Sequence, residues 1–289
     1  MDDRHLRTLI GERHPTSSTT ALRQAEDYLT EQFKILGLAV STHPFKALGG
    51  TYRNVIGTHS ASNPSSEAES PLVIAAHYDT VIGSPGADDN ASALAVMLEV
   101  ARCLRDVRLN RDVRFIAFCL EEEDLLGSLA YASWLRESNQ RIDGAIVLEC
   151  VGYARPDEGS QRKPPGVPVA VPSMGDFLAI VGNTASARLA AVVEGAAKEH
   201  VPELKTVSLL VPGNGELLPD TRRSDHAAFW HYGYPAVMLT DTANFRNPNY
   251  HQPTDTLDTL DLEFMEKVAH AVTAAVLDME GAGMKKSVQ

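Results

Sequence analysis

Histidines and carboxylates stand in this sequence directly after short apolar runs, or in the loop before a helical stretch. His77, Glu121, Glu122 and Glu149 follow such runs, and Asp89 stands in the loop. His251 lies further along, ten residues after Asp241, which follows the apolar run 235–240. Four carboxylates brought to one place repel one another and raise some of their pKa values, and a divalent cation removes that repulsion. Imidazole and carboxylate ligands without thiolate suit zinc in a hydrolytic site, with manganese or cobalt as substitutes. The residue types therefore predict the site of a metal-dependent hydrolase.

The apolar runs that precede these residues have the character of buried strands. Strand-like runs lie at 72–76, 113–119, 145–148, 177–181, 206–211 and 235–240, and helical periodicity at 20–37, 91–104, 126–137, 185–200 and 262–279. Continuous apolar strands that alternate with helices indicate a largely parallel sheet covered on both faces. Because parallel strands bring their C-terminal ends to one edge of a sheet, where ligands bind, the candidate residues can converge there.

Each short motif also has a simpler reading when it is taken alone. Spacing of the type HxD occurs by chance, and an acidic run such as 121–124 is typical of a helix start. Asp88-Asp89-Asn90 resembles an ordinary turn that caps the following helix. It is the coincidence of these motifs at one sheet edge that favours a shared site. Asp79 would then orient His77, and small residues at Gly86 and Ala87 would let the loop turn so that Asp89 reaches inward.

Composition limits the partners and the compartment. The 289 residues carry 26 basic and 38 acidic side chains, a net charge of −12, which argues against a nucleic-acid partner. No apolar run approaches the ~20 residues that span a bilayer, so no membrane partner is expected. Three cysteines without close pairing fit a reduced compartment and provide neither disulfides nor a thiolate zinc site. The N-terminal residues lack the apolar core of a signal peptide. The sequence therefore predicts a cytoplasmic protein.

The length allows one large domain or two small ones. No segment has the character of a linker, so we expect a single domain over 1–289 with its core at about 20–280. The Ser-rich stretch 60–70 is predicted to be a surface loop, a hairpin connection between Val55 and Leu72. The irregular stretches 152–175 and 212–223 are either walls of a pocket or surface excursions.

Five motifs carry a family resemblance. They are HYDTV, GADDNASALAVMLEVAR, FCLEEEDLLGS, SDHAAFWHYGYPAVML and NPNYHQPTDTLDTL. Together and in this order they resemble metallopeptidase family 28, the co-catalytic dinuclear zinc aminopeptidases of the leucyl aminopeptidase type, over roughly 22–279. The resemblance implies a three-layer α/β/α fold of the zinc-exopeptidase kind, with a mostly parallel mixed central sheet.

The resemblance also implies a role for each matching residue and two Zn²⁺ ions per chain. The matching positions are His77 and Glu122 as ligands of one zinc each, Asp89 as the bridging carboxylate, Glu149 and His251 as the remaining ligands, Glu121 as the general base, Tyr250 as a donor to the oxyanion, and Asp79 as the partner of His77. A water that bridges two zinc ions has a pKa lowered toward neutrality. Glu121 would take its proton and pass it to the leaving amine, which predicts hydrolysis of the N-terminal bond of peptides.

Two alternatives stay open at this point. Glu149 stands where the familiar aminopeptidases carry Asp, and its longer side chain narrows the space for a free N-terminus, so a carboxypeptidase or deacylase of the same fold is one alternative. A single-zinc acyltransferase resembling glutaminyl cyclase is the other, although the Asp89-Asn90 pair favours the two-metal hydrolase. Arg222 and Arg223 either place a cation near a substrate carbonyl or carboxylate or lie on the surface. The preferred substrate side chain and the oligomeric state are not predicted.

Overall fold

The apolar runs form the strands of one mixed sheet. The computed structural model describes residues 3–62 and 70–281. The strands are β1 (Ala39–Ala47), β2 (Gly50–His59), β3 (Leu72–His77), β4 (Val113–Phe118), β5 (Gly144–Glu149), β6 (Phe177–Asn183), β7 (Lys205–Val211) and β8 (Ala236–Thr240). They pair as an 8-stranded sheet in the order β1-β2-β4-β3-β5-β8-β6-β7. The predicted α/β class and the mixed, largely parallel sheet are confirmed, while the single-domain division stays a prediction.

Strand direction decides which residues share an edge. Strands β4, β3, β5 and β8 are parallel neighbours in the middle of the sheet, so their C-terminal ends meet at one edge. Strand β6 runs antiparallel to β8, and β7 is parallel to β6, so these two strands end at the opposite edge. The expectation that every strand delivers its C-terminus to one edge is therefore wrong for β6 and β7.

The N-terminal part of the sheet was not predicted from the sequence. Strands β1 and β2 form an antiparallel hairpin that turns at Leu48 and Gly49, both with positive φ. The predicted hairpin between Val55 and Leu72 is wrong, because β4 lies between β2 and β3 in the sheet. Residues 63–69 of the predicted surface loop lie outside the described residues.

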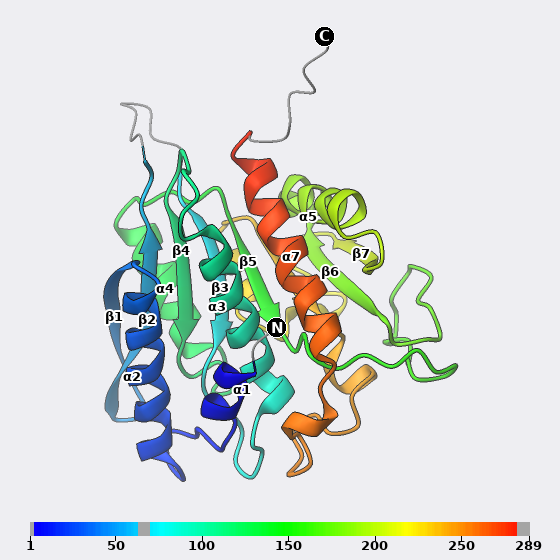
Figure 1. The fold of residues 1–289 in the computed structure, drawn as a ribbon, viewed down its shortest axis with the longest axis horizontal. Helices are drawn as coiled ribbons and strands as arrows, with labels where there is room; N and C mark the ends of the chain where they lie inside the picture. Colours follow the sequence, from blue (N-terminus) through cyan, green and yellow to red (C-terminus); the bar gives the residue numbers. More distant parts are fainter. Residues whose placement is uncertain (1–2, 63–69, 282–289) are drawn as a thin grey trace.

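Helices cover both faces of the sheet (Figure 1). The α-helices are α1 (Arg4–Leu9), α2 (Thr19–Ile35), α3 (Ala93–Leu104), α4 (Leu126–Glu137), α5 (Ala187–His200), α6 (His226–His231) and α7 (Leu262–Met279). Helices α2, α3, α5 and α7 pack into one hydrophobic core on one face. Helices α4 and α6 pack into a second core on the other face. No described helix is long and apolar enough to cross a membrane.

Helical cover of the second face is incomplete. The second core contains α4 and α6, but over β6 and β7 it is completed by Val167, Val169 and Val171 from the irregular stretch 152–175. Residues of two short 3-10 helices, η3 (Pro219–Arg222) and η4 (Ala243–Phe245), lie beside this stretch in the wall of the same cavity. A loop covering a sheet packs less completely than a helix, and a cavity remains beneath it.

Candidate metal centre

The parallel strands bring the predicted residues to one edge. His77 is the last residue of β3 and pairs in register with Phe118, the last residue of β4. Glu121 and Glu122 follow β4 within four residues, and Glu149 is the last residue of β5. Side chains at the C-terminal ends of adjacent parallel strands lie close together, as expected from the sequence.

Asp89 lies between the two histidines and contacts both. Its Oδ1 is 3.2 Å from Nε2 of His77, and its Oδ2 is 3.0 Å from Nε2 of His251. Each histidine also has a glutamate beside it. Oε2 of Glu149 is 3.5 Å from Nε2 of His77, and Oε2 of Glu122 is 3.3 Å from Nε2 of His251. The arrangement is therefore a double cluster with one carboxylate shared between its halves.

These residues form overlapping groups of metal-ligand type. His77, Asp89 and Glu149 form one group, and Asp89, Glu122 and His251 form another, each with ligand atoms within 4.8 Å of one another. His77, Glu121 and Glu122 form a third group that does not contain Asp89. Within the described part of the chain, Nε2 of both histidines and both oxygens of Asp89 are buried without a hydrogen bond of acceptable geometry. Buried polar atoms without partners are costly, so their convergence fits a site that binds a cation.

The loop that carries Asp89 is fixed from several sides. Gly86 has a φ of +62°, and a Cβ there would lie 2.4 Å from the carbonyl oxygen of Asp89, so only glycine fits this close turn. The carboxylate of Asp255 accepts hydrogen bonds from the backbone N–H of Asp88 at 2.9 Å and of Asp89 at 3.2 Å. The Asp89-Asn90 peptide bond is cis. Asn90 donates to the carbonyl of Leu148 at 3.1 Å, which ties the loop to β5.

Asp79 acts on the glutamates as well as on His77. Its two carboxylate oxygens accept hydrogen bonds from the backbone N–H groups of Glu121 and Glu122, each at 3.1 Å. Nδ1 of His77 lies 3.2 Å from the main-chain carbonyl of Asp79 and 3.7 Å from its carboxylate. The predicted contact with His77 is present, but the main chain makes its shorter part, while the carboxylate holds the loop after β4.

The protonation of the cluster follows from burial and close charges. Burial, with the charge of Asp89, raises the pKa of Glu122 to about 7. Burial, with the nearby carboxylates of Glu149 and Glu122, also raises the pKa of Glu121 well above its ordinary range. Burial lowers the pKa of His251, but its contacts with Asp89 and Glu122 outweigh this and raise that pKa to about 10. In the metal-free cluster, protons therefore offset part of the negative charge, and a bound cation would displace them.

Tyr250 and His251 lie in the loop after β8. The two rings are stacked, with centroids 3.8 Å apart and an interplanar angle of 16°. The Tyr250 hydroxyl accepts a hydrogen bond from Nη2 of Arg223 at 3.2 Å. Burial raises the pKa of Tyr250 well above its ordinary value, so the phenol keeps its proton at neutral pH and can donate it in a hydrogen bond.

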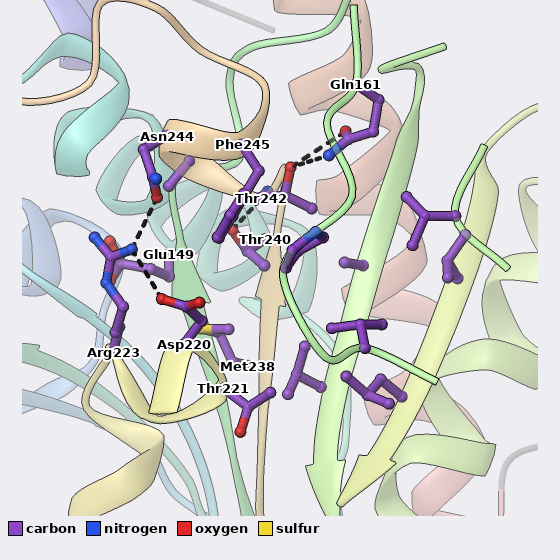
Figure 2. Close-up of a pocket in the computed structure, with 18 of the residues that line it drawn as sticks. Glu149, Gln161, Asp220, Thr221, Arg223, Met238, Thr240, Thr242, Asn244 and Phe245 are labelled. Carbon is purple, nitrogen blue, oxygen red and sulfur yellow. Dashed lines mark hydrogen bonds and ion pairs between the residues drawn. The ribbon is translucent and has the colours of Figure 1, made fainter. Parts of the chain in front are cut away.

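An apolar cavity opens beside the cluster (Figure 2). Glu149 and Tyr250 belong to its wall, so the cavity adjoins the candidate metal centre. Its apolar lining comes from β6, β7, β8 and the stretch 152–175, through Val167, Val169, Val171, Phe177, Ala179, Val181, Val207, Leu209 and Met238. Arg223, Asp220 and Asn244 form a polar part of the wall. Both irregular stretches, 152–175 and 212–223, thus contribute to the wall of a pocket.

Several supporting residues were not singled out from the sequence. Ser224 is fully buried and donates to Oε2 of Glu149 at 2.8 Å. Arg13 is buried and donates to the carbonyls of Tyr78 at 2.7 Å and Gly86 at 3.2 Å, next to the loops of two candidate ligands. Ser224 lies within a quoted motif and could have been found there, whereas nothing around Arg13 in the sequence marks it.

The α/β fold and a cluster of ligand-type residues at the sheet edge fit a metal-dependent hydrolase. The sequence model of peptidase family M28 matches residues 54–276. The chain therefore belongs to peptidase family M28, and it is a hydrolase of peptide bonds. The family resemblance inferred from the motifs is confirmed.

Relatives in sequence cover the chain to different extents. The uncharacterized protein YfbL of Escherichia coli (strain K12) is 32% identical over 287 residues, which cover 93% of this chain and 85% of YfbL. Aminopeptidase YwaD of Bacillus subtilis (strain 168) is 29% identical over 230 residues, which cover 79% of this chain and 45% of YwaD. The chain thus spans less than half of YwaD.

Solved structures agree with the fold. BSAP, a zinc aminopeptidase from Bacillus subtilis, superimposes with a TM-score of 0.61 and 27% identity, over 84% of this chain and 53% of BSAP. The glutaminyl cyclase of Porphyromonas gingivalis superimposes with a TM-score of 0.68 and 19% identity, over 96% of this chain and 95% of the cyclase, a likeness of fold alone. The family, together with the zinc aminopeptidase BSAP, supports zinc as the metal.

Proposed function

We propose that this chain is a dinuclear zinc aminopeptidase that removes the N-terminal residue from peptides. The observation that carries the proposal is the position of Asp89, whose two oxygens face the two histidines at 3.2 and 3.0 Å. A carboxylate shared between two ligand groups suits two cations better than one. His77 and Glu149 would complete one zinc site with Asp89, and His251 and Glu122 the other.

Zinc, when bound, polarises the scissile carbonyl and lowers the pKa of water. The remaining steps belong to the chain's own residues. Glu121 lies beside the cluster, with Oε2 3.8 Å from Nε2 of His77, and it belongs to neither ligand group that contains Asp89. Its carboxylate would take the proton of the attacking water and deliver it to the leaving amine. Tyr250 would donate its phenol proton to the oxygen that becomes negative.

The cavity supports a substrate with a large apolar N-terminal side chain. Its wall is mostly aliphatic and aromatic, and Glu149 lies at the point where the cavity meets the cluster. A side chain seated in this cavity would place its own α-carbon and carbonyl beside the candidate metal centre. Burying such a side chain is favourable by roughly 2 kcal/mol, so it contributes both affinity and selection.

Two other reactions of the same fold remain to be separated from this one. A carboxypeptidase or deacylase is suggested by Glu149 in place of the usual Asp. A single-zinc acyltransferase is suggested by the cyclase neighbour, which superimposes over 96% of this chain. The shared position of Asp89 and the complete second ligand group favour the two-metal hydrolase over the acyltransferase.

The test is a panel of leucine-containing dipeptides and tripeptides with free, N-acetylated or C-amidated ends, assayed with the zinc-loaded enzyme. We expect cleavage of free and C-amidated substrates and none of the N-acetylated ones, together with about two zinc ions per chain by elemental analysis. Cleavage of only the N-acetylated substrates would make the protein a carboxypeptidase or deacylase. One zinc ion per chain, together with cyclisation of N-terminal glutamine, would make it an acyltransferase.

The predicted cytoplasmic location is tested separately, by cell fractionation.

A further inference from the structure

We propose that Arg223 is a positioning residue that holds the Tyr250 hydroxyl so that its proton is available to the substrate. The inference rests on the proposed function, because it concerns the oxygen that becomes negative during hydrolysis. From the sequence alone, both arginines before Ser224 lie either near a substrate carbonyl or carboxylate or on the surface. The geometry points to a third role for one of them, in which it acts through a tyrosine.

The guanidinium of Arg223 is fixed from two sides. Nη1 donates to Oδ1 of Asn244 at 2.8 Å, and Nη2 donates to the Tyr250 hydroxyl at 3.2 Å. The guanidinium carbon also lies 5.6 Å from the centre of the Tyr250 ring, within the range of a cation–π contact. Figure 2 shows Arg223 between Asn244 and Asp220 at the cavity, linked to both by dashed lines. The side chain is 41% exposed, so it stands at the mouth of the cavity.

This contact decides where the phenol proton can go. Arginine has five N–H donors and no acceptor, so the Tyr250 oxygen must accept from Arg223 and cannot give its own proton to it. Among the described residues, none accepts a hydrogen bond from the Tyr250 hydroxyl. A hydroxyl that accepts from a cation is also a stronger donor, because hydrogen bonds in a chain polarise one another. The proton is thus left for an acceptor that arrives with the substrate.

The ring of Tyr250 has a second contact. Its ring stacks on His251, whose Nε2 contacts Asp89 and Glu122. A phenol ring that swings away from this position loses its stacking contact with a candidate zinc ligand. The stacking sets the position of the ring and Arg223 sets the direction of the hydroxyl, so the two contacts have different roles.

The neighbouring arginine serves as a matched control. Arg222 lines a separate surface depression with Leu125, Leu129 and Ala227, whereas Arg223 lines the cavity with Tyr250. Both are arginines at the end of the same 3-10 turn, and both are at least partly exposed. Replacement of either removes one positive charge from the same region, but only Arg223 contacts Tyr250.

The experiment is a double-mutant cycle on the zinc-loaded enzyme with a peptide substrate. We expect Arg223→Met to lower kcat about tenfold to a hundredfold with KM changed less than about threefold, because the loss falls on the transition state. In a Tyr250→Phe background the same replacement should lower kcat by no more than about twofold. Arg223→Lys should recover part of the activity, and Arg222→Met should change kcat by less than about twofold. Full additivity of Arg223→Met and Tyr250→Phe would overturn the proposal.

Two further measurements distinguish this role of Arg223 from direct binding of the substrate and from a loss of the proposed activity as a whole. If Arg223 instead binds a substrate carboxylate, Arg223→Met will damage cleavage of free dipeptides but spare C-amidated ones; we expect equal losses for both. Calorimetry with an aminoalkylphosphonate and with free leucine gives a readout without turnover. Arg223→Met should weaken binding of the tetrahedral phosphonate about tenfold and that of leucine less than about twofold. An unchanged phosphonate affinity contradicts the role of Arg223, whereas a wild-type protein that binds neither ligand and cleaves no peptide contradicts the proposed function itself.

Discussion

The two walls of the site differ in how they are built. The polar wall consists of His77, Glu121, Glu122 and Glu149 at the ends of β3, β4 and β5, with Asp89 in front of them. The apolar wall consists of β6, β7 and β8 under the irregular stretch 152–175. The C-terminal ends of β3, β4 and β5 carry the charged groups of the candidate metal centre. Strands β6, β7 and β8, which lie under the stretch 152–175, carry the apolar groups that line the cavity. Under the proposed function, chemistry and substrate selection would therefore belong to different halves of one sheet.

Each wall is held by its own set of buried polar contacts. In the polar wall, carboxylates accept hydrogen bonds from backbone N–H groups, as Asp79 and Asp255 do. In the apolar wall, one buried arginine fixes the loop, because Arg246 donates to Gln161 at 2.8 Å and to the carbonyl of Phe177 at 2.8 Å. Gln161 in turn donates to Thr242 at 2.9 Å. We therefore expect changes in the polar wall to act on turnover, and changes in the apolar wall to act on substrate choice.

The largest effect is expected at Glu121. Replacement by Gln keeps the size of the side chain and removes its ability to take a proton, so kcat should fall by about a thousandfold or more. Elemental analysis should show an unchanged zinc content, because the two groups that share Asp89 keep all their ligands and glutamine keeps a side-chain oxygen in the third group, His77, Glu121 and Glu122. Steady-state kinetics with a leucyl substrate measures the loss.

Glu123 provides the matched control for this change. It lies two residues further along the same acidic run, with its carboxylate 3.2 Å from Nε2 of His14, and it belongs to none of the ligand groups found among the described residues. Glu123→Gln should change kcat by less than about threefold. If Glu121→Gln retains a tenth of the wild-type kcat or more, the base is another group and the polar wall does not have the role proposed for it.

The apolar wall is tested by filling the cavity. Ala179 on β6 is a small residue in the cavity wall, and Ala179→Phe would place a ring where a substrate side chain would lie. We expect kcat/KM for N-terminal Leu or Phe to fall about ten- to a hundredfold, while kcat/KM for N-terminal Ala falls less than about threefold. The ratio between substrates is its own control, since a loss of folded protein would lower all of them equally. Equal losses for Ala and Leu would mean that this cavity does not select the substrate.

The polar wall is also the part that could be predicted from the sequence. His77 and Glu149 end their strands, and Glu121 and Glu122 follow β4. The apolar runs that indicate strands, and the position of each residue at or after the end of such a run, were therefore enough to predict that they share one edge. The geometry brings all five candidate ligands together as that prediction requires, and their roles remain to be tested. Local patterns suffice where each residue is fixed by the strand that precedes it.

The apolar wall could not be predicted in the same way. Its lining depends on β6 and β7 running opposite to β8, and no local pattern encodes strand direction. Its cover depends on contacts between residues far apart in sequence, such as Arg246 with Gln161. Arg13 is a similar case in the polar wall, since it contacts Tyr78 and Gly86 across the N-terminal third of the chain.

A smaller effect is expected beneath the site, at His226 of α6. The ring is fully buried, with Nε2 2.8 Å from the carbonyl of Thr221 and an edge-on contact with Trp230. Burial lowers its pKa from 6.5 to about 4. Between these values the unfolded chain binds a proton that the folded chain excludes, so stability is present above about pH 6.5 and is lost as the pH falls toward 4.

The measurement is the free energy of unfolding in urea at about pH 7.5 and about pH 5, with chelator present at both so that zinc release does not contribute. We expect the wild-type protein to lose about 2 kcal/mol more than His226→Gln over this interval. Glutamine keeps a donor for Thr221 but does not titrate, so the difference between the two losses isolates the imidazole. Equal losses would show that His226 is protonated in the folded protein or does not contribute.

The smallest effect is expected at Ser224, where the two walls meet. Its hydroxyl donates to Oε2 of Glu149 at 2.8 Å, while the next residue toward the N-terminus, Arg223, lies in the wall of the cavity. Ser224→Ala removes one hydrogen bond worth about 1 kcal/mol, so zinc affinity should fall about fivefold, measured by competition with a fluorescent chelator. Ser186→Ala is the control, because Ser186 is equally buried and bonded to Asn183 at 2.6 Å but follows β6 at the opposite edge. If both variants lose zinc affinity alike, the effect is one of general stability and the contact with Glu149 does not orient a ligand.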